Sequence, residues 1–174
     1  MQKRPNATTL KGAGLTLVGP QLKPGDKAPD FTCATGIKDT LSLAQTAGKA
    51  RLFSVVPSLD TPVCSTQTKK FNEGLAALKD RAACYTVSMD LPFAQGRFCT
   101  SEKISNLQTL SDTHNGSFGR NYGVLIEGLA MPLLGRAIFV VDAGGTIRHA
   151  EYVPEVASEP NYEAALSALK AAAT

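Results

Sequence analysis

Two short apolar runs and a third strand-like stretch, separated by stretches with helical spacing, are the feature that most constrains the fold of this chain. The apolar runs cover residues 52–56 and 137–141, and the other expected strand covers 85–89. Apolar runs of about 4–8 residues are typical of strands that are buried on both faces of a sheet. The first run ends at Pro57, a residue without the N–H that a central strand needs. We therefore expect a buried sheet at the centre of the fold.

Helices and turns are expected around these strands. A strand–helix–strand order indicates parallel strands joined by a crossover helix, and a hairpin near the end adds antiparallel strands. The fold class expected is α/β: a thioredoxin-like fold with a central mixed β-sheet flanked by helices and an N-terminal β-hairpin extension. The other expected strands are a hairpin arm over 1–20, a strand over 31–34, and a hairpin strand over 146–153 after a turn at 142–145. The expected helices cover 62–79 and 161–172. A partly helical segment over 93–104 is expected to open a long helical connection.

Composition excludes several classes of protein. The 174 residues are 43% hydrophobic and 19% charged, which is typical of one globular domain spanning 1–174. The net charge of +3 comes without a Lys/Arg cluster, so no nucleic-acid partner is expected. The basic start at residues 1–4 is not followed by an apolar segment, and no run reaches membrane-spanning length. We expect no membrane association and a cytoplasmic location.

The four cysteines need separate interpretations. None is spaced as C-x-x-C and neither histidine is near one in sequence, so a structural zinc site is not expected. Cys33 and Cys84 are expected to be core thiols, and His149 is expected on the surface of the hairpin. The four cysteines are Cys33, Cys64, Cys84 and Cys99, and the two histidines are His114 and His149.

Cys64 stands where a loop enters a helix. Thr61 is a plausible N-cap and Pro62 suits the first helical position, which puts Cys64 in the first turn. Unpaired backbone N–H groups and the positive end of the helix dipole there favour a thiolate, the reactive form of cysteine. Position alone leaves two interpretations open, a reactive thiol or a buried inert one.

A family resemblance is carried by Pro57, Thr61 and Cys64, which match the P-x-x-x-T-x-x-C signature of peroxiredoxins. Three further segments, 70–72, 90–99 and 159–166, resemble the thiol peroxidase branch, the atypical 2-Cys peroxiredoxins. The resemblance extends from about residue 10 to the end of the chain. Its second motif, DLPFAQGRFC, ends at Cys99.

The resemblance implies a role for each site residue. Cys64 is the peroxidatic cysteine and Cys99 the resolving one, Pro57 shields the site, Thr61 hydrogen-bonds the peroxide, and Arg136 is the active-site arginine. It also implies hydrogen peroxide and alkyl or lipid hydroperoxides as substrates, thioredoxin as reductant, and a homodimer. No metal, flavin or haem is expected.

The chemistry adds a conformational requirement. A sulfenic acid on Cys64 condenses with a nearby thiol, and a disulfide needs Cα atoms within about 7 Å. If both cysteines are seated in helices, at least one helix must partly unwind, and Gly96 is expected to ease this step. Phe93 and Met131 are expected either to line an approach for apolar substrates or to lie in the core.

Two alternatives remain. A thioredoxin-like disulfide oxidoreductase or isomerase would share the fold, although the absence of C-x-x-C weighs against it. A non-enzymatic redox sensor or binding module would undergo the same oxidation of Cys64 and Cys99 without rapid turnover. Consumption of peroxide and recycling by thioredoxin separate these alternatives from a peroxidase.

Overall fold

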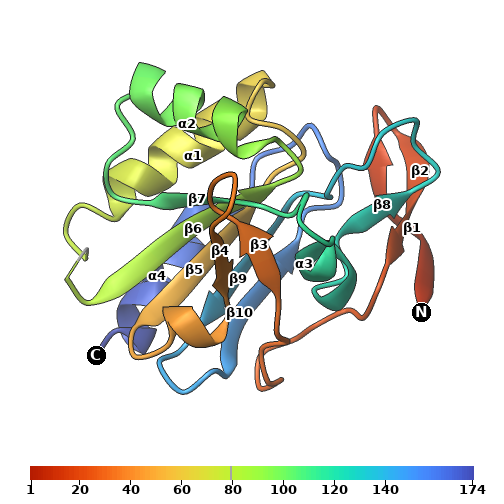
Figure 1. Cartoon of the computed structure of the whole chain (residues 1–174). Helices are drawn as coiled ribbons and strands as arrows, with labels where there is room; N and C mark the ends of the chain where they lie inside the picture. The colour runs from red at the N-terminus through yellow and green to blue at the C-terminus, as the bar shows by residue number, and fades with distance from the viewer. Residues whose placement is uncertain (79) are drawn as a thin grey trace.

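A seven-stranded mixed sheet forms the centre of the computed structural model, which describes residues 1–78 and 80–174 (Figure 1). The strand order is β10-β9-β5-β6-β7-β3-β4. β5 pairs in parallel with β6, and β6 with β7, whereas β5–β9 and β9–β10 are antiparallel. The strands are β3 (Thr32–Ala34), β4 (Thr40–Ser42), β5 (Ala50–Val55), β6 (Ala82–Ser88), β7 (Gln108–Ser111), β9 (Ala137–Val141) and β10 (Ile147–Tyr152).

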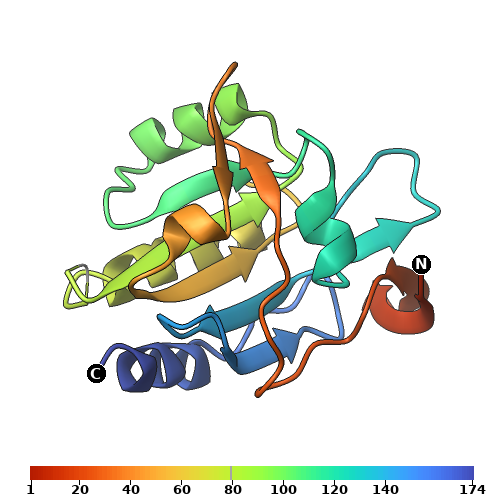
Figure 2. The same ribbon diagram turned by 60° about the horizontal axis from the view of Figure 1, so that its bottom comes forward.

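Helices lie on both sides of this sheet, which confirms the expected thioredoxin-like α/β class. α1 is the crossover between the parallel strands β5 and β6. Figure 2 shows α4 below the sheet and α2 beside β7. The helical elements are η1 (Ala44–Thr46), α1 (Pro62–Gly74), α2 (Pro92–Ser101), α3 (Ser117–Asn121) and α4 (Tyr162–Ala172).

A small second sheet contains the expected N-terminal hairpin. β1 (Lys3–Leu10) pairs with β2 (Ala13–Val18), and β2 pairs with β8 (Leu125–Glu127). Backbone hydrogen bonds from Thr9 N to Pro154 O and from Val156 N to Thr9 O tie β1 to the segment after β10. The hairpin is therefore joined to the main body near the end of β10.

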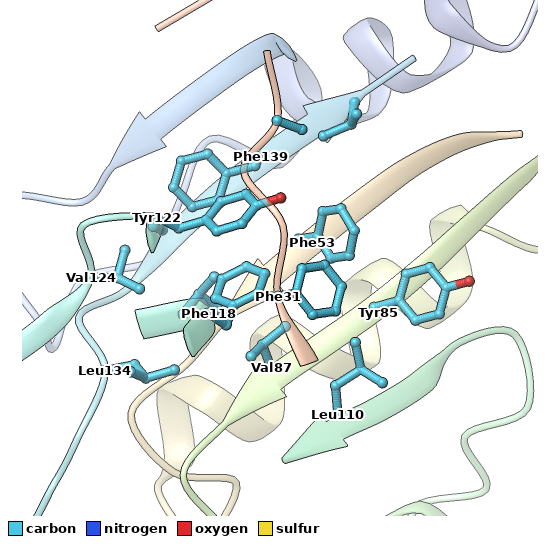
Figure 3. Packing of buried hydrophobic residues seen from close by; sticks show 14 of the residues in the cluster. Phe31, Phe53, Tyr85, Val87, Leu110, Phe118, Tyr122, Val124, Leu134 and Phe139 are labelled. Carbon is cyan, nitrogen blue, oxygen red and sulfur yellow. The ribbon is translucent and has the colours of Figure 1, made fainter. Parts of the chain in front are cut away.

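The core divides into two layers because strand side chains alternate between the faces of the sheet. Phe53 and Val55 of β5 pack on the face that α3 covers, whereas Leu52 packs on the face that α1 and α4 cover. The first layer is aromatic: the rings of Phe118 and Tyr122 stack with centroids 4.1 Å apart, and Phe31 meets the neighbouring rings edge-on (Figure 3). This two-sided burial explains the continuous apolar runs in the sequence.

Two expected elements are wrong. The first helix ends at Gly74 rather than continuing to 79, and residues 75–78 form turns; the expected end at Lys79 lies outside the described residues. Leu75 and Leu78 are nevertheless buried, because a tight turn after the helix keeps them facing the core. The long helical connection after α2 contains β7, α3 and β8 instead. These elements have three to five residues each, too few to show a period.

Candidate active site

Cys64 lies in the first turn of α1, as expected. α1 has Thr61 as its N-cap residue and Pro62 in its first turn. The backbone N–H groups at this end have no acceptor inside the helix, so they add to the positive potential around the sulfur. The Cys64 side chain is fully buried in a small apolar cluster with Val56 and Leu59.

Arg136 contacts the sulfur of Cys64. Its Nη2 lies 3.3 Å from Sγ, although the two residues are 72 positions apart. The sheet explains the meeting: β9 is antiparallel to β5 with Ala137 opposite Val55, so the residue before β9 lies beside the loop that follows β5. Arg136 is 3% exposed, and a buried cation near the sulfur stabilises a thiolate.

The guanidinium is held by uncharged acceptors. Nε and Nη2 donate to the carbonyl oxygen of Val156 at 2.9 and 2.7 Å, and Nη1 donates to Oε1 of Gln67 at 2.8 Å. No carboxylate accepts a hydrogen bond from it within residues 1–78 and 80–174. Within these residues its positive charge is therefore not neutralised by a hydrogen-bonded carboxylate beside Cys64.

Gln67 was missed by the sequence analysis. It is fully buried, and its Nε2 donates to Oγ of Ser54 at 2.7 Å. A signal was present, since residues three apart share one face of a helix and Gln67 is the polar residue one turn after Cys64. Gln67 links β5, α1 and Arg136 in one buried hydrogen-bonded chain.

The Thr61 hydroxyl has a different role from the one its N-cap position suggests. It makes no side-chain cap; its Oγ1 donates to the carbonyl of Ser58 at 2.9 Å. Thr61 is thus the N-cap residue by position, as expected, but its hydroxyl is directed to the loop and accepts no hydrogen bond from the helix. With its proton committed to Ser58, the oxygen keeps lone pairs that can accept a hydrogen bond from a substrate.

A cavity of about 190 Å³ opens beside this site. It brings together three of the residues expected in the site, Pro57, Thr61 and Arg136, and it is largely apolar. Leu10, at the end of β1, was not expected here, because no local pattern reports where the hairpin docks. The cavity is lined by Leu10, Pro57, Thr61, Pro62, Val63, Arg136, Val156 and Ala157.

Cys99 lies in α2 as a half-buried free thiol. Burial raises its pKa, and a hydrogen bond with Thr109 offsets part of that rise. Its neighbour Phe98 packs against the cluster that contains Cys64. In its helical form, α2 therefore places Phe98, rather than Cys99, in contact with the cluster around Cys64.

The other cysteines are core thiols, as expected. Cys33 and Cys84 are buried, and desolvation raises the pKa of each thiol well above its usual range. Both therefore remain protonated at neutral pH. Cys33 also donates to the buried carboxylate of Asp112, with the two atoms 3.8 Å apart.

Several other expected positions are corrected. Phe93 and Met131 are 67% and 61% exposed, so neither is a core residue, and neither lines the cavity beside Cys64. His149 is half-buried with Nε2 unpartnered, and burial lowers its pKa, because β10 is packed more closely than a surface hairpin. His114 is exposed.

Across the described part of the chain, no three His, Cys, Asp or Glu side chains converge as metal ligands do. Among those same residues, no helix combines the length and the apolar character that crossing a membrane requires.

Comparisons with known proteins show the family of the chain. Residues 23–166 match the Redoxin family. A thiol peroxidase of Streptococcus pneumoniae is 51% identical over 163 residues, covering 94% of this chain and 98% of that protein, and one of Bacillus subtilis is 48% identical, covering 94% and 96%. The crystal structure of a peroxiredoxin-like protein from Aquifex aeolicus superposes with a TM-score of 0.89 at 41% identity, covering 96% of this chain and 97% of that one.

The redoxin fold, with a cysteine at the start of a helix and an arginine against its sulfur, defines the class of peroxiredoxin-type peroxidases. Within that class, the chain belongs to the thiol peroxidase family. The protein is accordingly an enzyme, an oxidoreductase that acts on peroxides through a thiol.

Proposed function

We propose that the protein reduces hydrogen peroxide and organic hydroperoxides at Cys64, that Cys99 resolves the oxidised sulfur as an intramolecular disulfide, and that thioredoxin returns the disulfide to thiols. We further propose that it acts in the cytoplasm as a single domain that assembles into a homodimer. The contact between Arg136 and Cys64, 3.3 Å long, is the observation that carries the proposal.

In the first step, the Cys64 thiolate attacks one oxygen of the hydroperoxide. A sulfur–oxygen bond forms, the oxygen–oxygen bond breaks, and the leaving oxygen takes a proton from solvent to become water or an alcohol. Arg136 and the free N–H groups at the start of α1 stabilise the negative charge that moves from sulfur to oxygen. The Thr61 oxygen accepts a hydrogen bond from the hydroxyl group of the substrate and so orients it, while Pro57 limits access of water.

In the second step, the Cys99 sulfur attacks the sulfenic sulfur of Cys64, and the oxygen leaves as water. Because Phe98 of α2 packs on the cluster around Cys64, α2 must partly unwind before the two sulfurs can bond. A thiol of thioredoxin then attacks the disulfide and restores both cysteines by exchange.

The substrate class follows from the cavity beside the site. Its walls are mostly apolar, including Leu10, Val63 and Val156, so an alkyl chain gains free energy by leaving water there. This supports organic hydroperoxides as substrates in addition to hydrogen peroxide.

Intact-mass measurement after one equivalent of hydrogen peroxide tests the proposal. The wild type should lose two hydrogens, Cys99→Ser should gain one oxygen as a trapped sulfenic acid, and Cys64→Ser should show no fast reaction. Rapid peroxide consumption by Cys64→Ser would overturn the assignment of the peroxidatic cysteine. A mass loss in wild type without turnover in the presence of thioredoxin, thioredoxin reductase and NADPH would overturn the assignment of the reductant.

A further inference from the structure

We propose that Asp90 is a positioning residue that holds the loop before α1 and the start of α2 in one arrangement, which favours oxidation of Cys64 and restrains disulfide formation with Cys99. The inference rests on the roles proposed above for these two cysteines. Asp90 lies between β6 and α2 and lines no part of the cavity beside Cys64.

The Asp90 carboxylate accepts three hydrogen bonds. Oδ1 accepts from Oγ of Ser58 at 2.7 Å, and Oδ2 accepts from the backbone N–H of Leu59 at 2.8 Å and from Oγ of Ser88 at 2.8 Å. Charged acceptors form hydrogen bonds about twice as strong as neutral ones. One side chain therefore anchors two consecutive residues of the loop that carries Pro57 and Thr61.

The loop passes this restraint to the site. The carbonyl of Ser58 accepts from both N and Oγ1 of Thr61, at 3.2 and 2.9 Å, so fixing Ser58 fixes Thr61 at the mouth of the cavity. Leu59 packs directly in the cluster with Cys64. Asp90 thus sets the position of the groups around the sulfur through Ser58 and Leu59.

The same carboxylate is connected to α2. Ser88, which donates to Asp90, accepts from Nε2 of Gln95 at 3.0 Å, and Gln95 also donates to the carbonyl of Leu110 at 2.9 Å. Gln95 is 1% exposed and lies one helical turn before Cys99. Unwinding α2 far enough to bring Cys99 to Cys64 must disturb this buried network.

The two connections have opposite effects on the two chemical steps. A fixed loop keeps Thr61 and the start of α1 aligned for attack on the peroxide, whereas a fixed α2 delays the approach of Cys99. Loss of the carboxylate should therefore slow the first step and leave the second unchanged or faster. A mutation that only destabilises the fold has no reason to separate the steps in this way.

Asp90→Asn is the main test, because asparagine keeps the shape but puts an NH₂ group against a donor. Oxidation of Cys64 is measured in a Cys99→Ser background, and disulfide formation in the wild-type background, both by quenched flow, alkylation and intact mass. We expect the second-order rate constant of oxidation to fall about tenfold to a hundredfold, as a misplaced reactive group causes. The rate of disulfide formation should not fall, so less sulfinic acid should accumulate in excess peroxide.

Two further variants separate the role of Asp90 from a general effect on folding: one weakens the same network, and the other changes a distant carboxylate. Ser58→Ala removes one of the three hydrogen bonds to the carboxylate, together with the one that Ser58 Oγ accepts from the backbone N–H of Asp60. It should slow oxidation by a smaller factor and leave disulfide formation unchanged. Asp142→Asn alters a carboxylate with three hydrogen-bond donors, Gly144, Thr146 and Arg148, at the opposite end of the sheet, and it should change neither step.

The outcomes decide the proposal. Equal slowing of both steps in Asp90→Asn, or no change in either, would overturn the role of Asp90. That failure differs from a failure of the proposed function, in which the Cys64→Ser protein still consumes peroxide rapidly whatever residue stands at position 90.

Discussion

Gln67 holds Arg136 against the sulfur of Cys64. The amide oxygen accepts from Nη1 at 2.8 Å, while Nη2 of the same guanidinium lies 3.3 Å from Sγ. Because Gln67 and Cys64 lie one turn apart on α1, the distance between cation and sulfur is set largely within a single rigid helix. Ser54 of β5 fixes the other end of the amide.

Gln67→Met should slow oxidation of Cys64 about tenfold, because the guanidinium loses one of its acceptors and its orientation. Disulfide formation, measured separately, should change little. Gln45→Met is the control, since Gln45 of η1 accepts hydrogen bonds from Ser42 at the end of β4 and lines no part of the cavity beside Cys64. Full activity in Gln67→Met would mean that Val156 alone holds Arg136.

Gly96→Ala should slow disulfide formation and leave oxidation of Cys64 unchanged. A Cβ at Gly96 meets no atom within 4 Å, so alanine fits, and it stabilises a helix by about 1 kcal/mol relative to glycine. If resolution proceeds as proposed, with α2 unwinding before Cys99 reacts, that stabilisation corresponds to about fivefold slower resolution.

Quenched-flow measurement of the mass loss of two hydrogens checks this, with Gly128→Ala as a control for an exposed glycine outside α2. Gly128 has a φ of +86°, so the control carries a strained backbone and tests whether general destabilisation affects resolution. Unchanged resolution in Gly96→Ala contradicts the idea that α2 limits the reaction.

The buried strands could be predicted from the sequence because each packs on both faces. The runs at 52–56 and 137–141 correspond to β5 and β9, which are completely buried. The short strands β4 and β8 have three residues each and are half exposed, so neither composition nor alternation reveals them. Their pairing partners, distant in sequence, decide their conformation.

The site could be predicted only in part. Thr61 and Pro62 mark the start of a helix by local rules, which placed Cys64 in its first turn. Arg136 was predicted from the family resemblance alone, because its contact with Cys64 depends on the antiparallel register of β5 and β9. No sequence pattern predicted that Leu10 belongs to the site, since only the docking of the hairpin brings this residue to the cavity.

Leu10→Asn should reduce activity toward apolar alkyl hydroperoxides and spare hydrogen peroxide. Leu10 lines the cavity and is 41% exposed, so the change removes apolar contact area without opening the core. Losing about 40 Å² of such contact corresponds to about 1 kcal/mol, or about fivefold in kcat/KM. The measurement is the ratio of kcat/KM for cumene hydroperoxide to kcat/KM for hydrogen peroxide. The control is the same ratio in Ile37→Asn, because Ile37 is an apolar residue that is 81% exposed and does not line the cavity. An unchanged ratio shows that alkyl chains do not use this cavity.

The carboxylate of Glu155 fastens the tip of the hairpin beside Val156, the residue whose carbonyl holds Arg136. It accepts from Oγ1 of Thr9 at 2.5 Å and from the backbone N–H groups of Lys11 and Gly12 at 3.0 and 3.2 Å. These hydrogen bonds, the one from Thr9 foremost, lower the pKa of Glu155 from an ordinary 4.5 to about 2.

A lowered carboxylate pKa means that the ionised form stabilises the folded state. The contribution is complete above pH 4.5, and it is lost as the pH falls through about 2. The carboxyl carbon of Glu155 should therefore titrate near pH 2 by NMR, and the hydrogen-exchange protection of the Lys11 and Gly12 amides should fall over the same range. In Glu155→Gln, these two amides should already be less protected at neutral pH and show no such fall, because the neutral side chain has no proton to gain. A Glu155 that titrates near 4.5 in the folded protein would show that its hydrogen bonds to the hairpin are not formed in solution.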